Sequence, residues 1–143
     1  MAARFFGALG ALATIFSFFV LIISYANYPE DVLVYINNSG DPVTYLSKSS
    51  MFYIALAFYI IINATLLGLR KIQDDEKNMF QVGLGVTQIF FNMFFSSSVY
   101  FINILNSREN FNYSNFGYLI YVTGVLLMVS ILITAFVRIV LKK

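Results

Sequence analysis

The sequence contains no cysteine and no histidine among its 143 residues. Disulfides, thiolate nucleophiles and imidazole bases are therefore excluded, together with the two side chains that most often bind zinc. Charged residues are also scarce at 11%, whereas soluble globular domains carry about 25%. So few charges could not cover a water-exposed surface of ordinary size. The net charge of +2 is too small to indicate a nucleic-acid partner.

Hydrophobic residues make up 59% of the chain, and they gather in four long apolar segments. These run over residues 5–25, 51–69, 79–105 and 118–141. Each is long enough to cross a bilayer, which takes about 20 helical residues. Because lipid offers no hydrogen bonds, each segment must satisfy its own backbone as a helix. The sequence therefore predicts a single all-α integral membrane domain, a four-transmembrane-helix bundle in contact with lipid.

The distribution of lysine and arginine predicts how these helices are oriented. On one side of the bilayer the basic residues are Arg4, Arg70, Lys71, Lys77, Arg138, Lys142 and Lys143, and on the other they are Lys48 and Arg108. Because positive charge is enriched in cytoplasmic segments, both termini and residues 70–78 are predicted to face the cytoplasm. Residues 29–50 and 106–117 then form the two outer loops. The first segment exceeds the core of about 7–15 residues found in signal peptides, so we expect it to be retained.

One face of the third segment is polar. Its members, spaced three or four residues apart, are Gln81, Gly85, Gln88, Asn92 and Ser96. Amides are unfavourable against lipid, so this face should point into the bundle or at a partner protein, which makes the third helix the best buried. Asn63, near the centre of the second segment, is its expected partner. The pattern favours interhelical hydrogen bonds, and the lining of a polar pocket is the alternative.

Small residues recur on the first segment, where Ala3, Gly7 and Ala11 are four apart. They allow two helix backbones to approach closely, and the neighbour is either another helix of this chain or another subunit. No Asp, Glu or Lys lies deep in any segment, which argues against proton-coupled transporters and voltage sensors. Residues 74–76, Asp-Asp-Glu, are interpreted as a helix N-terminal cap in preference to metal ligands.

The first outer loop carries the most specific pattern in the chain. Residues 32–36 and 43–46 are short strand-like runs, and the intervening Asn-Asn-Ser-Gly-Asp-Pro is dense in turn formers. This arrangement predicts a small extracytoplasmic hairpin. The candidate contact residues on this outer loop are Tyr35, Asn37, Gly40, Asp41, Pro42 and Tyr45.

The same loop carries a family resemblance over about residues 29–58. The matching positions, in register and without a gap, are Pro29, Val32, Asn37, Gly40, Pro42, Tyr45, Ser47 and Lys48. On these residues the segment resembles the small N-terminal membrane domain of the SdpI-type immunity proteins of bacteria. Three positions depart from that pattern, since Leu33, Tyr35 and Val43 stand where the family has proline, histidine and aspartate. The resemblance implies a bacterial inner membrane and a loop that guards against, or senses, an extracellular peptide.

Two functions from different classes follow. The first is a structural or accessory subunit that docks onto other membrane protein subunits through the polar face of the third helix or the small-residue face of the first. The second is an SdpI-like immunity or signalling protein whose outer loop binds an extracellular peptide. No nucleophile–base pair or convergent acid pair can be assembled from these residues, so we predict no enzyme, no catalytic or metal site and no cofactor.

Overall fold

The fold consists of four long helices and one small β-hairpin. The computed structural model describes residues 1–37, 39–72, 78–107 and 113–140. The elements are α1 (Ala2–Asn27), β1 (Asp31–Ile36), β2 (Pro42–Ser47), α2 (Lys48–Ile72), α3 (Asn78–Leu105) and α4 (Tyr113–Val140). All four helices are long and apolar enough to cross a membrane. The chain is thus a multi-pass membrane protein with the predicted all-α four-helix architecture.

Helix α3 is the centre of the bundle. Helices α1 and α4 pack closely against it, and α2 contacts both α3 and α1. In its most apolar stretch, 39% of α3 is buried, against 17% for α1 and for α4, so the third helix is the best buried, as predicted. Within the described part of the chain, α4 contacts no helix besides α3. The bundle is therefore open on the side where α2 and α4 face each other.

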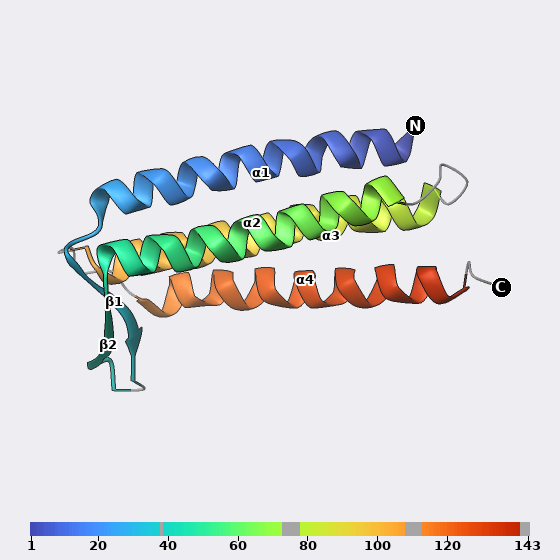
Figure 1. Ribbon diagram of the computed structural model, residues 1–143. Helices are drawn as coiled ribbons and strands as arrows, with labels where there is room; N and C mark the ends of the chain where they lie inside the picture. The colour runs from blue at the N-terminus through green and yellow to red at the C-terminus, as the bar shows by residue number, and fades with distance from the viewer. Residues whose placement is uncertain (38, 73–77, 108–112, 141–143) are drawn as a thin grey trace.

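The two ends of the bundle differ in what they carry. The start of α1 and the end of α4 lie at one end, and the hairpin stands at the other, with its strands running across the helix direction (Figure 1). Among the described basic residues, Arg4, Arg70, Lys71 and Arg138 lie in the terminal turns at the first end, and Lys48 begins α2 beside the hairpin. The hairpin and the two termini are thus on opposite sides of any membrane that these helices span.

Glycines set how closely α3 approaches its neighbours. A methyl group added at Gly10 of α1 would lie 2.7 Å from Oε1 of Gln88, which is closer than van der Waals contact allows. On the other side of α3, a methyl group added at Gly83 would lie 2.7 Å from Oγ1 of Thr134 in α4. Small residues at these crossings let the backbones pack closely, as is usual for helices in lipid.

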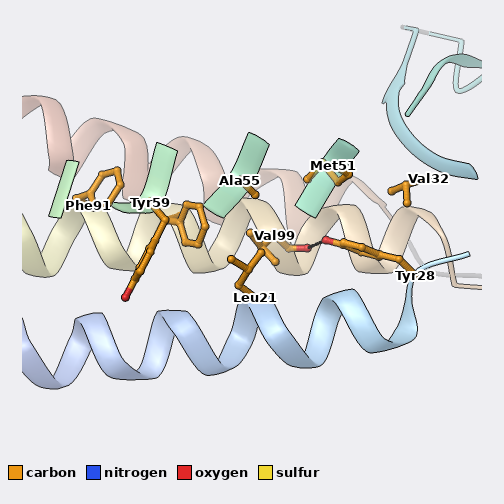
Figure 2. Close-up of a cluster of buried hydrophobic side chains, with 9 residues drawn as sticks. Leu21, Tyr28, Val32, Met51, Ala55, Tyr59, Phe91 and Val99 are labelled. Atoms are coloured by element: carbon orange, nitrogen blue, oxygen red, sulfur yellow. Dashed lines mark hydrogen bonds between the residues drawn. The ribbon is translucent and has the colours of Figure 1, made fainter. Parts of the chain in front are cut away.

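Helix α2 is held to α3 by aromatic rings. Tyr59 and Phe95 have ring centroids 5.2 Å apart, and Phe58 and Phe91 have centroids 5.7 Å apart, within the range of favourable aromatic pairs. Tyr59, Phe91 and Phe95 belong to an apolar core that α1, α2, α3 and β1 share (Figure 2). Large rings keep two helix backbones further apart than glycines do. Helix α2 therefore contacts α3 through side chains, whereas α1 and α4 approach its backbone.

The hairpin forms over the segment that the turn residues predict. Strands β1 and β2 pair antiparallel, with Val32 opposite Leu46 and Leu33 opposite Tyr45. In the turn, the side-chain Oδ1 of Asn37 accepts hydrogen bonds from the backbone N–H groups of Ser39 and Asp41, at 2.9 and 2.8 Å. Gly40 has a φ of +87°, a conformation that is strained for other residues. Asn37 and Gly40 therefore determine the turn.

The helices extend beyond the predicted apolar segments, since α1 covers Ala2–Asn27 and α2 ends at Ile72. Helix α4 begins at Tyr113, so residues 113–117 are helical and do not belong to an outer loop. Helix α2 begins at Lys48, directly after β2, and the hydroxyl of Ser47 caps it by accepting the backbone N–H of Ser50 at 3.2 Å. Hydropathy marks only the part of a helix that lies in lipid, so it misses polar first turns. The expectation for residues 74–76 lies outside the described residues.

Substituting Gly10 tests the close crossing of α1 and α3. We expect Gly10→Val to lower the free energy of unfolding by about 1–3 kcal/mol, because the added methyl groups overlap the buried Gln88 amide. Unfolding in mixed micelles with increasing dodecyl sulfate measures it. Gly68→Val is the matched control, since no atom lies within 4 Å of a methyl group at Gly68, and it should stay within about 0.5 kcal/mol of the parent. Equal losses for both variants would contradict the crossing.

Candidate functional site

A seam of small and hydroxyl side chains on α1 faces α3. Its buried small members are Ala3, Gly10, Ser17 and Ser24, which recur at every seventh residue. Thr14 lies between two of them and points the same way. A seven-residue repeat keeps one stripe of a helix against its neighbour. This stripe, and not the four-residue spacing alone, places polar groups of α1 beside those of α3.

Four side chains from three helices meet at this seam and form a polar cluster, which we define as Thr14, Asn63, Gln88 and Asn92. Asn63 Oδ1 accepts hydrogen bonds from Asn92 Nδ2 at 3.0 Å, from Thr14 Oγ1 at 3.0 Å and from Gln88 Nε2 at 3.4 Å. Thr14 Oγ1 accepts from Gln88 Nε2 at 3.1 Å and from Asn92 Nδ2 at 3.2 Å. Gln88 and Asn92 are both 0% exposed. The cluster thus joins α1, α2 and α3 inside the span.

The polar cluster continues toward the hairpin end. Ser17 donates a hydrogen bond to the backbone carbonyl of Asn92 at 3.0 Å, and Ser96 donates to the Ser17 hydroxyl at 2.8 Å. From Gln88 to Ser96 this covers about 12 Å of helix α3. A groove of about 230 Å³ between α1 and α4 reaches its outer part at Ser17, Asn92 and Ser96. The four side chains of the cluster and the two serines are all neutral, and their hydrogen bonds fix the register of three helices.

Arg70 closes the end of the polar cluster that is farther from the hairpin. The sequence places it as a cytoplasmic anchor, but its side chain is half-buried and turns across the bundle onto Gly7 of α1. Its Nη1 donates to Gln88 Oε1 over 3.5 Å, and its Nε is buried without a hydrogen-bond partner. The Arg70 guanidinium occupies the space that a side chain at residue 7 would need. Gly7 therefore makes room for the Arg70 side chain and not for the close approach of a helix backbone.

The predicted helix-packing residues differ in how they are placed in the structure. Gly85 packs on α1, where a methyl group would lie 3.1 Å from the backbone of Phe6, and Gln81 is half-buried. The expected contact of Asn63 with the third helix is present. Ala11, however, is exposed, so it does not pack on another helix of this chain. The face advances by three and four residues in turn, which selects Gly10 and passes over Ala11.

Some residues of the polar cluster were not among the predicted ones. Gly10, Thr14 and Ser17 belong to it or pack against it, and Tyr59 adds a hydrogen bond from its hydroxyl to the Thr14 carbonyl. The spacing of small residues by seven along α1 is the signal that could have found Gly10 and Ser17, and Thr14 lies on the same face, four residues after Gly10. No signal in the sequence indicates Tyr59, because its hydroxyl reaches α1 only once α2 is in place.

The predicted contact residues of the hairpin fall into two groups. Asn37, Gly40 and Asp41 build the turn, where Asn37 Nδ2 also donates to the Asp41 carboxylate at 3.1 Å. Tyr35 and Tyr45 are 55% and 54% exposed. Pro42 is exposed as well and starts β2. The turn residues therefore shape the hairpin, and the two tyrosines form its accessible aromatic surface.

The hairpin is fixed to the end of α3. The Asn106 side chain accepts the Leu33 backbone N–H at 2.8 Å and donates to the Leu33 carbonyl at 2.9 Å, so one amide pairs with the outer edge of β1 as a neighbouring strand would. Val32 is 0% exposed, and the Tyr28 hydroxyl donates to the Val99 carbonyl at 3.1 Å (Figure 2). Burial raises the pKa of the Tyr28 hydroxyl, which keeps this donor neutral.

An apolar groove lies between α2 and α4, on the open side of the bundle. It has a volume of about 350 Å³. Its walls and floor are formed by Phe58, Ile62, Thr65 and Leu66 of α2, Thr87, Phe91 and Phe94 of α3, and Leu127 and Ile131 of α4. The groove follows from the packing described above, because aromatic rings hold α2 away from α3 while α4 approaches α3 closely.

Comparison with known proteins gives no relative of this chain. No protein-family model matches it, and neither does any curated protein or solved structure. Within the described residues, no three His, Cys, Asp or Glu side chains lie together as metal ligands would. The polar cluster, the α2–α4 groove and the hairpin are therefore the features from which its function is inferred.

A double-mutant cycle on Asn63 and Asn92 tests the polar cluster. We expect Asn63→Ala and Asn92→Ala each to destabilise the bundle, with a coupling energy of about 0.5–2 kcal/mol between them, because each amide is a partner of the other. Unfolding in mixed micelles provides the four free energies. The control cycle pairs Asn63→Ala with Ser98→Ala, since Ser98 bonds only its own helix at the Phe94 carbonyl and should give no coupling beyond about 0.3–0.5 kcal/mol. Equal coupling in both cycles would contradict the cluster.

Two substitutions at Asn106 test the anchor of the hairpin. We expect Asn106→Ala to raise the hydrogen-exchange rate of the Leu33 amide about five- to tenfold, since that N–H loses a bond worth about 1 kcal/mol. Asn106→Asp retains an acceptor for the same N–H, so Leu33 should exchange at nearly the parent rate. Exchange resolved by residue in detergent micelles measures both variants. Identical rates for Asn106→Ala and the parent would show that Asn106 does not protect β1.

Proposed function

We propose that this chain is a non-enzymatic inner-membrane protein that acts as an accessory subunit of a larger membrane complex. The observation that carries this proposal is the apolar α2–α4 groove on the open side of the bundle. A transmembrane helix of the partner would lie in it. Both chain termini would face the cytoplasm, in accordance with the basic residues that gather at their end of the bundle.

The shape of the groove supports a helix as its occupant. In the described part of the chain, the backbones of α2 and α4 do not approach each other within 8 Å between Cα atoms, although both approach α3. A fifth helix placed there would touch all three and would bury Phe58, Phe94 and Leu127, which line the groove. In lipid, helices associate through van der Waals packing and not through hydrophobic transfer, so a preformed concave surface is what favours a specific partner.

The polar cluster supports the same side for docking. Gln88 and Asn92 are fully buried and bonded to α1 and α2, so the two central amides of the polar face are used within the chain. The small-residue face of the first helix is likewise occupied by α3 and by Arg70. Both surfaces that the sequence offers for docking are thus used internally. The proposed interface lies instead on the side of α2 that faces α4.

Filling the groove tests this proposal. We expect Thr65→Trp, which places an indole in the groove, to reduce the fraction of the protein that is recovered in a larger complex by at least about tenfold. Native mass measurement after mild detergent extraction from its own membrane provides this fraction. Ile22→Trp on the lipid-facing side of α1 is the matched control and should leave the complex intact. A parent protein that is recovered only as a free monomer would overturn the proposal.

A second function is supported by the hairpin. We propose that it contacts an extracellular peptide, as the resemblance to SdpI-type immunity proteins implies. Tyr35 and Tyr45 are more than half exposed on a hairpin that Val32 and Asn106 fix to the bundle. Exposed aromatic groups on a rigid support are typical of binding surfaces. This function is compatible with the first, because the groove and the hairpin occupy different parts of the molecule.

A further inference from the structure

The two outer edges of the hairpin are not equivalent. At the outer edge of β1, the backbone N–H and C=O of Leu33 are both paired with the Asn106 amide. No strand or side chain is recorded at the outer edge of β2 within the described residues, since the sheet has only two strands. One edge of the hairpin is therefore closed and the other is open.

The register identifies which backbone groups the open edge presents. The Lys48 N–H donates to the Glu30 carbonyl at 2.8 Å. This bond determines which residue pairs of the two strands are hydrogen-bonded to each other and which are not. In an antiparallel pair, every second couple of residues directs its N–H and C=O groups away from the partner strand. Leu33 and Tyr45 are such a couple, because the groups of Leu33 bond Asn106 and not β2. Tyr45 therefore directs its backbone N–H and C=O outward. Ser47, two residues on, directs its N–H outward, while its C=O, as that of the N-cap residue, accepts the first hydrogen bond of α2.

The pairing of β1 and β2 is irregular between Leu33 and Ile36, and the part of the open edge beyond this irregularity, Tyr45–Ser47, lacks the features that usually protect an edge. Natural edge strands are shielded by charged side chains, by proline or by a covering element. Strand β2 has the sequence Pro-Val-Thr-Tyr-Leu-Ser, in which no residue is charged and proline occupies only the first position. Five of its six residues are exposed. The segment Tyr45–Ser47 is thus a regular, uncharged and accessible template for another strand.

The charges around the hairpin indicate the partner that would suit this edge. Glu30, Asp31 and Asp41 are exposed acidic residues of the described hairpin segment. Lys48 is its single basic residue, and the Lys48 ammonium lies 5.1 Å from the centre of the Tyr25 ring, in a cation–π contact. The hairpin thus carries a net negative charge. An extended peptide with lysine or arginine would be attracted to it, whereas an acidic one would be repelled.

We propose that the outer edge of β2 binds an extended, basic peptide from the extracytoplasmic side as a third strand. This inference rests on the second function proposed above and specifies how the hairpin would recognise its ligand. Hydrogen bonds from Tyr45 and Ser47 to the peptide backbone supply affinity that tolerates different sequences. The acidic side chains supply the preference for positive charge.

A pair of substitutions at one position separates edge pairing from side-chain recognition. Tyr45→Pro removes the outward N–H, and proline is tolerated at edge strands because that N–H is not part of the ladder. Tyr45→Val removes the aromatic ring and keeps the N–H. The probe is a display library of random nine-residue peptides, selected on the parent protein in lipid nanodiscs with its outer face accessible.

We expect the selected peptides to be rich in lysine and arginine. Their affinity should fall at least about tenfold on Tyr45→Pro and change less than about threefold on Tyr45→Val. In the parent protein, a bound peptide should also slow hydrogen exchange of the Tyr45 amide, a measurement that does not depend on any variant folding. Exchange at Leu46, whose N–H faces β1, reports whether the hairpin of Tyr45→Pro is intact.

The other outcomes are equally decisive. If selected peptides lose affinity on Tyr45→Val but not on Tyr45→Pro, the hairpin recognises peptides through the tyrosine ring, and edge pairing is wrong while the second function stands. If no peptide is selected, or if the selected ones leave exchange at Tyr45 unchanged and bind both variants equally, the hairpin is not a peptide-binding surface. In that case both the inference and the second function fail, and docking through the α2–α4 groove is unaffected.

Discussion

The arrangement of the bundle depends on the hydrogen bonds among three amide side chains that are buried inside the membrane span. Water is absent there, so each amide must find its partners within the protein or pay a large desolvation cost. Asn63, Gln88 and Asn92 meet this requirement together with Thr14 of α1. Two of these amides belong to α3, which is why α3 is central and the most buried helix.

The remaining packing follows from how the other helices accommodate this centre. Glycines let α1 and α4 approach α3 closely, whereas aromatic rings hold α2 at a greater distance. The same difference in spacing creates the α2–α4 groove. A surface suited to a partner helix thus results from the side chains that stabilise the chain itself. Arg70 adds a charge at the end of the polar cluster that is farther from the hairpin, where Gly7 leaves room for its side chain.

At the other end of the bundle, the hairpin is an extension of the same core. Val32 is buried with residues of α1, α2 and α3 (Figure 2). Asn106 at the end of α3 pairs with the backbone of β1. These contacts fix β1 and leave β2 exposed. The hairpin consequently presents one strand edge and two tyrosines on a rigid support, and the helices that carry it are available for interactions within the membrane.

The sequence by itself determined the membrane class, the four spans, the hairpin turn at Asn37 and Gly40, and the pairing of Asn63 with the polar face of α3. Each of these depends on local properties: hydropathy, turn chemistry or spacing along one helix. Only the tertiary structure decided that Gly10 and not Ala11 lies at the α1–α3 crossing, that Arg70 turns inward, and that Asn106 closes the edge of β1. These features depend on the relative rotation and distance of segments far apart in the chain, which no local pattern encodes.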